Sequence, residues 1–371
     1  MSTPVSWYTL SNEAEVFSPT LLVYPDRVDQ NIRRTVEIAG DAKRLWPHVK
    51  THKMAAVLAM QIAAGIDKFK CATIAEAEMT AAGGAAEVLL AYAPVGPNVV
   101  RWRRLMQAYP QVRFGALFDD TVALQSCGAE LHAHGLTCAA MIDIDCGMGR
   151  TGIAPDEHAA SLYAQLARTP GITPAGLHVY DGHIVDPNLG TRRTQSEAAM
   201  VGVFSLRDRL LHDGLPVPRV ICGGTPTFAM HAEHADRDCS PGTTVFWDAG
   251  YGGKYPELPF EPAALLLTRV ISKPRPGRLC VDLGYKAVSA DQPHPRVQFL
   301  NLPDAKAVVH SEEHLAIETS AADRFQVGDA LYGVPQHVCP TVALHREAIV
   351  VREGVACDRW PVTARDRVIT I

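Results

Sequence analysis

The chain has 371 residues, of which 47% are hydrophobic and 20% are charged, a balance typical of a globular protein with a large core. The formal net charge of −5 makes nucleic acid and anionic membrane surfaces unsuitable partners. We expect no signal peptide, because the first residues lack a basic and then an apolar region, and no run approaches the roughly 20 apolar residues that span a bilayer. The nine cysteines follow no framework spacing, so we expect reduced thiols and a cytoplasmic location.

Short apolar runs alternate with helical patterns through the first two thirds of the chain, which predicts β/α units and a parallel sheet. The expected strands are residues 45–49, 69–73, 88–92, 113–118, 138–145, 174–180, 219–222 and 243–246. Eight such units fit a TIM (β/α)8 barrel. We therefore assign an α/β fold class and place the barrel domain at residues 25–255.

Beyond residue 255 the pattern changes, because a group of prolines is followed by strand-like runs with few helical patterns. Glu353-Gly354 is typical of a hairpin turn between residues 349–352 and 355–358. We expect a second, mainly β domain at residues 256–371, joined by a strand from residues 1–24.

Lys50 follows the first expected barrel strand. Active sites of TIM barrels lie at the C-terminal ends of the strands. A poorly solvated lysine there has its ammonium form disfavoured, so its amine becomes available for Schiff-base chemistry. A lone lysine is more often an ordinary surface residue, so this interpretation depends on its neighbours.

Other polar residues fall at the same ends of later strands. Arg150 follows the fifth expected strand and Tyr180 the sixth. The turn 223–225, with the sequence Gly-Gly-Thr, follows the seventh, where phosphate is often bound and where backbone N–H groups can face an anion. Each feature alone has a simpler interpretation. The turn could be a tight connection, Arg150 could form a surface ion pair, and Tyr180 could be a core residue. Together they indicate a site for pyridoxal 5′-phosphate (PLP).

A third group lies in the expected β domain. His337 and Cys339 are two residues apart on what we expect to be an extended segment, so both side chains would point to one side. Imidazole and thiolate form a pair that suits zinc. Two protein ligands would leave positions open for water or a substrate oxygen, as Lewis-acid catalysis requires.

These motifs resemble the D-threonine aldolase and D-serine dehydratase group of fold-type III (alanine-racemase-like) PLP enzymes. The matching elements are PHVKTHK around Lys50, DxGxxRxG at 145–152, LHxYDGH at 177–183, GGTPT at 223–227, FWDAGY at 246–251, SEEH at 311–314 and HxCPT at 337–341. The ordered set covers essentially the whole chain. The resemblance implies bound PLP, a divalent metal (zinc or manganese) and a homodimer that acts on a small D-amino acid.

The resemblance also implies roles for individual residues. Lys50 would hold PLP as a Schiff base, Arg150 and Tyr180 would lie beside the cofactor, and His183 is the candidate base. Gly223, Gly224 and Thr225 would hold the phosphate with Gly242 and Thr243, and His337 and Cys339 would bind the metal.

The implied activity is cleavage of D-threonine to glycine and an aldehyde. Cys339 departs from the aspartate that aldolases of this group often carry, and it keeps open a D-serine dehydratase. A related D-hydroxyaspartate dehydratase or aldolase is a further alternative. An amino-acid racemase would need a second acid or base, for which Tyr285 and Tyr332 are available. A non-catalytic PLP carrier would resemble the barrel alone.

Overall fold

The structure is a computed structural model that describes residues 6–371, and the chain forms two compact units. We call the first the barrel unit; it comprises Thr35–Lys50, Leu58–Gly242 and Asp366–Ile371. We call the second the β unit; it comprises Met1–Arg34, Thr51–Val57 and Thr243–Arg365. Within residues 6–371, we find no helix with the length and apolar character needed to cross a membrane.

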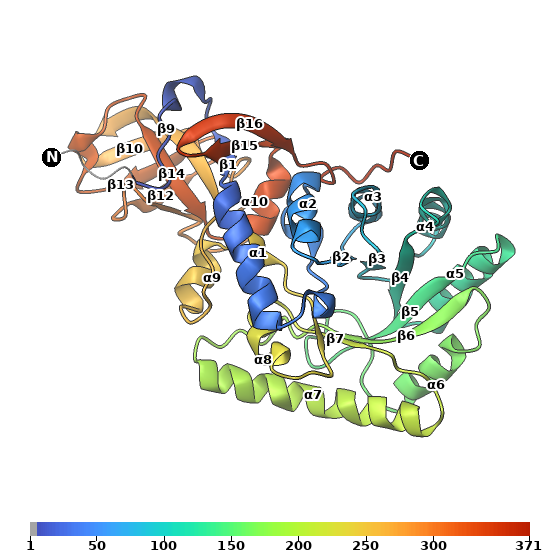
Figure 1. The fold of residues 1–371 in the computed structure, drawn as a ribbon. Coiled ribbons are helices and arrows are strands. Elements are labelled where there is room, and N and C mark those ends of the chain that lie inside the picture. Colours follow the sequence, from blue (N-terminus) through green and yellow to red (C-terminus); the bar gives the residue numbers. More distant parts are fainter. Residues whose placement is uncertain (1–5) are drawn as a thin grey trace. The chain divides into compact units, whose positions relative to one another are not determined.

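Seven strands of the barrel unit form one parallel sheet in sequential order. They are β2 Lys68–Cys71, β3 Glu87–Leu90, β4 Arg113–Phe118, β5 Cys138–Ile144, β6 Ile172–Val179, β7 Val220–Cys222 and β8 Asp238–Cys239. Helices lie on the outer side of the curled sheet between consecutive strands (Figure 1). They are α3 Ile74–Ala82, α4 Pro97–Ala108, α5 Thr121–Ala133, α6 Glu157–Leu166, α7 Leu189–His212 and the short α8 Phe228–Ala232.

The segment before β2 closes this sheet into a barrel. Leu45 forms a parallel bridge to Cys239 of β8, and His48 forms one to Lys70 of β2. The backbone N–H group of Trp46 donates to the carbonyl of Cys239 at 2.8 Å. This segment therefore occupies the place of the first of eight strands, and the predicted TIM barrel is confirmed.

The last strand of the barrel lies earlier than the sequence predicts. Residues 243–246 do not form a strand, because the 3₁₀ helix η4 (Thr243–Val245) turns the chain there and the Trp247 N–H group donates to the Thr243 carbonyl at 2.8 Å. The β-branched run favours a strand by propensity alone. Every residue of that run is buried, so its pattern does not distinguish a strand from a tight buried turn.

The barrel interior is apolar at one level and polar at the next. Trp46, Leu89, Leu117, Met141, Ala175 and Ile221 pack together as a buried layer contributed by five strands and the closing segment. Because side chains of a strand alternate, Asp143 points to the same side as Met141, one layer nearer the C-terminal end of β5. Lys70 and His178 contribute to this second, polar layer.

The β unit is built on a nine-stranded sheet in which β1 pairs antiparallel with β9 and parallel with β15. Its strands are β1 Thr20–Val23, β9 Ala264–Arg275, β10 Arg278–Val281, β11 Val297–Phe299, β12 Lys306–His310, β13 Leu315–Glu318, β14 Ala330–Pro335, β15 Glu347–Arg352 and β16 Val355–Pro361. The predicted hairpin turn is confirmed: Glu353 and Gly354, with φ of 48° and 74°, connect β15 to β16.

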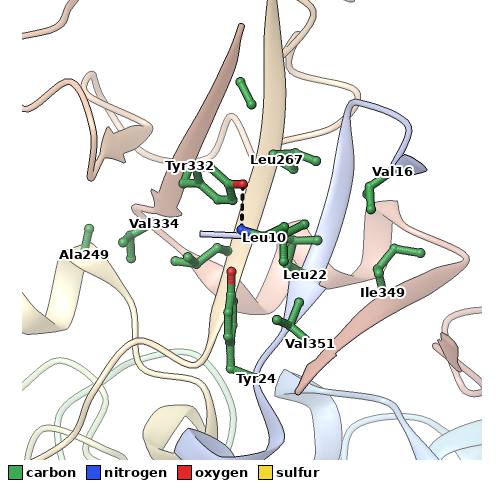
Figure 2. Packing of buried hydrophobic residues seen from close by; sticks show 12 residues of the cluster. Leu10, Val16, Leu22, Tyr24, Ala249, Leu267, Tyr332, Val334, Ile349 and Val351 are labelled. Atoms are coloured by element: carbon green, nitrogen blue, oxygen red, sulfur yellow. Dashed lines mark hydrogen bonds between the residues drawn. The ribbon is translucent and has the colours of Figure 1, made fainter. Parts of the chain in front are cut away.

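Tyr332 lies in the apolar core of this sheet, among residues of β1, β9 and β15 (Figure 2). Its side chain is 2% exposed, and its hydroxyl accepts the Leu10 N–H group at 3.2 Å and donates to the Glu13 carboxylate. Burial and the Glu13 carboxylate raise the pKa of Tyr332. The hydroxyl therefore stays neutral and acts as a structural link to the N-terminal segment.

Replacing Tyr332 by phenylalanine is expected to lower the free energy of unfolding by about 1–2 kcal/mol, because a buried hydroxyl and two hydrogen bonds are lost. Urea unfolding of the two proteins measures this difference. Tyr285→Phe is the matched control, since Tyr285 is 38% exposed and should cost almost nothing. Equal destabilisation by both changes would contradict the assigned role of the Tyr332 hydroxyl.

Candidate active site

Three basic side chains surround the ring of Tyr180 in the barrel unit. The Nζ atoms of Lys50 and Lys70 lie 6.0 and 5.7 Å from the ring centroid, and Cζ of Arg150 lies 4.7 Å from it. The sequence pointed to Lys50, Arg150 and Tyr180, and the structure brings them together. Such a concentration of positive charge around an aromatic ring suits an anionic, planar ligand.

The loop after β5 carries Arg150, and Asp145 shapes this loop. The Asp145 carboxylate accepts the N–H groups of Gly147 at 2.9 Å and Gly149 at 3.1 Å. These backbone hydrogen bonds, that of Gly149 first, hold the pKa of Asp145 below its ordinary value. The turn is thus fixed by a carboxylate that stays ionised, and it directs the following arginine over the Tyr180 ring.

The Gly-Gly turn after β7 needs both of its glycines. Gly223 has φ of +76°, and a Cβ atom placed on it would lie 2.5 Å from the ring of His231. A Cβ atom on Gly224 would lie 3.0 Å from the Tyr180 ring. A side chain at either position would therefore displace an aromatic ring, which explains the glycines without any reference to a ligand.

The backbone donors of this turn are already used within the protein. The Gly223 N–H group donates to β6 at 2.9 Å, and that of Gly224 donates to Asp181 at 3.2 Å. The Gly242 N–H group donates to the Thr225 hydroxyl at 3.2 Å, so these two predicted phosphate-binding residues are neighbours. Thr225 and Gly242 are thus the two residues of the predicted cradle that are hydrogen-bonded to each other, and their binding of a phosphate stays a prediction.

Asp181 is a site residue that the sequence reasoning missed. Its carboxylate accepts the Thr227 hydroxyl at 2.8 Å and pairs with Nε2 of His231 at 2.8 Å, and both members of this pair are at most 1% exposed. Asp181 also accepts the Gly224 N–H group, so its carboxylate holds the turn after β7 in place. A buried Asp–His pair can be foreseen only when the two strand ends are known to be neighbours.

His337 and Cys339 belong to the β unit, and the predicted extended segment is wrong. His337 precedes the helix α10 (Val338–Leu344), and Cys339 lies in its first turn. The buried Asp248 carboxylate accepts the Val338 N–H group at 3.1 Å and so caps the helix. Pro340 did not exclude a helix, because the first turn has no intrahelical partners for its N–H groups.

The His337 side chain interacts with Asp291 and Cys339. Its Nδ1 atom is 2.5 Å from the Asp291 carboxylate. Burial alone would lower the pKa of His337, but its contacts with Cys339 and Asp291 raise it to about 9. The imidazole of a metal-bound histidine commonly donates its other N–H group to a carboxylate in this way, so Asp291 fits the role of an orienting partner.

Two hydroxyl groups contact the Cys339 sulfur. Oγ1 of Thr51 lies 3.2 Å from it and Oγ1 of Thr243 lies 3.6 Å from it. Thr51 directly follows Lys50 in the chain, and Thr243, predicted to bind phosphate, directly follows Gly242. The structure thus places the Thr243 side chain against the candidate metal ligand.

A closed ring of hydrogen bonds supports the His337 side chain. The Ser289 hydroxyl donates to Asp291 at 2.5 Å and the Ser289 N–H group donates to Thr341 at 3.1 Å. The Thr341 hydroxyl in turn donates to the His337 carbonyl at 2.8 Å. No sequence pattern distinguishes Asp291 among the 40 acidic residues, because it lies 46 positions from His337.

Within residues 6–371, no group of three or more His, Cys, Asp or Glu side chains is arranged to hold a metal. A metal at His337 and Cys339 would therefore have two protein ligands among these residues. Imidazole and thiolate in direct interaction are a donor set that fits zinc. The remaining positions would be filled by water or substrate, as a catalytic site requires.

His183 lies on the exposed loop after β6. Its Nε2 atom would be 3.1 Å from a Cβ atom placed on Gly147, and its charge contributes to the lowered pKa of Asp145. The side chain is therefore beside the loop that carries Arg150. Its role as a base stays a prediction.

Comparison with known proteins adds an independent finding. The family model described as alanine racemase, N-terminal domain matches residues 23–249, and the model described as putative serine dehydratase domain matches residues 263–351. A 3-hydroxy-D-aspartate aldolase from Paracoccus denitrificans (strain Pd 1222) is 30% identical over 370 residues, which cover 96% of this chain and 94% of that protein. The chain belongs to the alanine racemase N-terminal domain family. The resemblance to fold-type III PLP enzymes is thereby confirmed.

Other members of the family are similar over most of their length. A D-threo-3-hydroxyaspartate dehydratase from Delftia sp. (strain HT23) is 28% identical, covering 88% of this chain and 92% of its own. The crystal structure of a D-threonine aldolase from Filomicrobium marinum has a TM-score of 0.89 at 28% identity, covering 98% of this chain and 99% of that one. With such relatives, this member of the family is a PLP-dependent lyase.

Two alternatives left open by the sequence lose their support in this family member. Of the two tyrosines that a racemase could use, Tyr332 is held in the core by Leu10 and Glu13, whereas Tyr285 is 38% exposed. The racemase therefore loses its support through the similarity to lyases and not through the tyrosines alone. A carrier would resemble the barrel alone, whereas the similarity to lyases extends through residues 263–351.

Proposed function

We propose that this protein is an aldolase that cleaves D-β-hydroxy-amino acids to glycine and an aldehyde, using PLP and a divalent metal. The single observation that carries the proposal is the His337–Cys339 pair with Asp291 behind it, because a racemase or a carrier has no use for a metal site. The similarity to aldolases over 96–98% of the chain supports it. Within this class, D-threonine and 3-hydroxy-D-aspartate are the two substrates to be distinguished.

PLP fits the residues of the barrel unit. Lys50 would hold its carbonyl carbon, and Thr225 with Gly242 would hold its phosphate. The space beside the ring of Tyr180 is kept open by Gly224, where a Cβ atom would fill it, and Arg150 would supply a positive charge. When bound, the cofactor withdraws electrons from Cα of an amino acid, which is the chemistry that lets a bond to Cα break.

Zinc fits the residues of the β unit better than manganese does, because Cys339 supplies a soft thiolate. His337 would be the second ligand, kept in orientation by Asp291 and the hydroxyl of Ser289. A divalent metal lowers the pKa of a bound hydroxyl group, which is the chemistry needed at the β-oxygen of the substrate. Manganese remains the alternative ion to be tested.

The remaining roles in the reaction would belong to side chains of the protein. Lys50 would hold the cofactor and supply the amine that reacts with its carbonyl carbon. Asp145 and Asp181 hold the loops that carry Arg150 and the glycine turn, so the positive charge and the phosphate site stay in place. His183, on the loop next to Asp145, is our candidate for moving the proton of the β-hydroxyl.

A dehydratase is the second candidate, and a specific observation favours it. The thiolate ligand Cys339 matches what dehydratases of this group carry, and the relative from Delftia sp. is a dehydratase. In that reaction the α-proton is removed and the β-hydroxyl leaves, giving a keto acid and ammonia. The same residues serve both reactions, and the outcome depends on which bond to Cα is aligned with the cofactor's π system.

One assay separates these candidates. The purified protein, with PLP and with zinc or manganese, is given D-threonine, 3-hydroxy-D-aspartate, D-serine and D-alanine in separate reactions. Glycine with an aldehyde supports the aldolase, and a keto acid with ammonia supports the dehydratase. Loss of optical activity without either product set would overturn both. We expect a homodimer in the same preparation, which analytical ultracentrifugation checks.

A further inference from the structure

Lys70 is a buried lysine to which the proposed chemistry gives no role. It is the third residue of β2, is 2% exposed and points into the polar layer of the barrel. Its Nζ atom lies 2.6 Å from Oγ of Ser240 and 3.3 Å from Nε2 of His178. Buried lysines are rare unless paired with a carboxylate, and neither of these partners is one.

The partners of Lys70 each make a further hydrogen bond, and these bonds show which atoms donate and which accept. Nδ1 of His178 lies 2.7 Å from the Asp143 carboxylate, which can only accept, so Nδ1 carries the proton. Burial lowers the pKa of His178, so the ring is neutral and its Nε2 atom accepts. The Ser240 hydroxyl donates to the Gly223 carbonyl at 2.9 Å, so its oxygen also accepts from Lys70.

Both partners of Lys70 are therefore acceptors. A neutral amine has two N–H groups, and both are consumed by Ser240 and His178. Its lone pair points away from these partners. The network is thus complete for an uncharged Lys70, and one further proton can be added to it without breaking either hydrogen bond.

Burial favours an uncharged Lys70, the charges of Lys50 and Arg150 act in the same direction, and the carboxylates of Asp143 and Asp181 raise the pKa of Lys70. Burial lowers the pKa of Lys70 to about 7, and the positive charge of Lys50 is the next largest cause. The charged and titratable groups that face Lys70 come from the segment before β2, from β5 and β6 and from the loops that follow them. They are Lys50, Asp143, Arg150, His178 and Asp181.

We propose that Lys70 takes up the proton that Lys50 must lose before its amine can capture the cofactor. The step balances as a proton transfer: the Nζ–H bond of a Lys50 ammonium breaks, its electron pair becomes the nucleophile, and the third N–H bond forms on Lys70. The two amines are neighbours of one ring, since their Nζ atoms lie 6.0 and 5.7 Å from the centroid of Tyr180. Nothing is oxidised or reduced. This inference rests on the proposed function, in which Lys50 binds PLP.

The rate of cofactor capture by the apoprotein tests the proposal. Apoprotein is prepared with hydroxylamine and dialysis, and the absorbance rise after PLP addition is followed from about pH 6 to about pH 9. We expect the wild-type rate constant to increase through an apparent pKa near 7. In Lys70→Met this inflection should disappear, and capture near pH 7.5 should slow by on the order of tenfold or more.

Two further variants separate proton transfer from charge and from packing. Lys70→Arg keeps a positive charge but has no lone pair, so it should be as slow as Lys70→Met. Lys68→Met is the matched control, because Lys68 points to the same side of the same strand but lies near Trp46, and it should keep the wild-type profile. A wild-type profile in Lys70→Met, or full rescue by arginine, would overturn the proposal.

A failure of the proposed function would give a different result from a failure of this inference. If the wild-type apoprotein forms no covalent band at any pH, Lys50 does not bind PLP, and the fault lies with the proposed function. The protonation of Lys70 can then still be tested by a second measurement that needs no cofactor. Unfolding of the apoprotein in urea reports the protonation of Lys70 directly.

The linkage between protonation and folding predicts the direction in which stability changes with pH. The pKa of Lys70 is about 7 in the folded protein and has its ordinary value near 10.4 in the unfolded chain. Between these values the unfolded chain binds more protons, so the stability of the wild type should rise with pH relative to Lys70→Met. Parallel stability curves for the two proteins would show that Lys70 is not a neutral amine and would overturn the proposal.

Discussion

Replacing Lys50 by alanine is expected to abolish the absorption band of covalently bound cofactor and to lower kcat/KM by on the order of 10⁴-fold or more. The reason is that, in the proposed function, the amine of Lys50 beside Tyr180 and Arg150 is the nucleophile, and alanine has no amine to take its place. Absorbance of the purified protein and product formation from the D-amino acids measure the two effects.

Lys254→Ala is the matched control, because Lys254 is an exposed lysine at the end of α9 (Ala249–Lys254). It should keep both the band and the activity. Borohydride reduction followed by peptide mapping locates the cofactor in the wild type. A label on Lys70 instead of Lys50 would reverse the roles of the two lysines and contradict both proposals.

Replacing Cys339 by alanine is expected to keep the cofactor band but to lower metal-dependent turnover by at least about 100-fold, because one of the two proposed protein ligands is lost. Asp291→Asn should weaken metal binding by roughly 10- to 100-fold, since the carboxylate that orients His337 is lost. Metal content after dialysis and competition with a chelator measure these effects separately from activity.

Cys357→Ala is the control for the thiol, because Cys357 is an exposed cysteine of β16 in the same unit. Its metal content and turnover should equal those of the wild type. Turnover that survives both chelation and the loss of Cys339 would remove the metal from the mechanism. The aldolase proposal would then lose the observation that carries it.

The sequence was sufficient for the residues whose position follows from local rules. Lys50, Arg150 and Tyr180 each follow a barrel strand, and strands of a closed parallel sheet place their C-terminal ends at one edge. Their gathering around one ring could therefore be predicted from order alone. The hairpin at Glu353-Gly354 was equally local, because its two residues have the positive φ that the turn type requires.

Where prediction failed, the deciding contact came from a distant part of the chain. Cys339 lies in a helix because Asp248, 91 residues earlier, caps that helix through the neighbouring Val338. The run 243–246 favours a strand by propensity, but the backbone turns back on itself there.

By itself, the sequence determined the α/β barrel and the mainly β unit and singled out the lysine and the His–Cys pair as candidates, because periodicity, strand order and residue type are local properties. Only the tertiary structure decided which groups support them. Asp181, Asp291 and the buried amine of Lys70 become partners of the site through neighbouring strands and loops. A buried polar group is defined by the acceptors and charges around it, and these are set by packing rather than by sequence spacing.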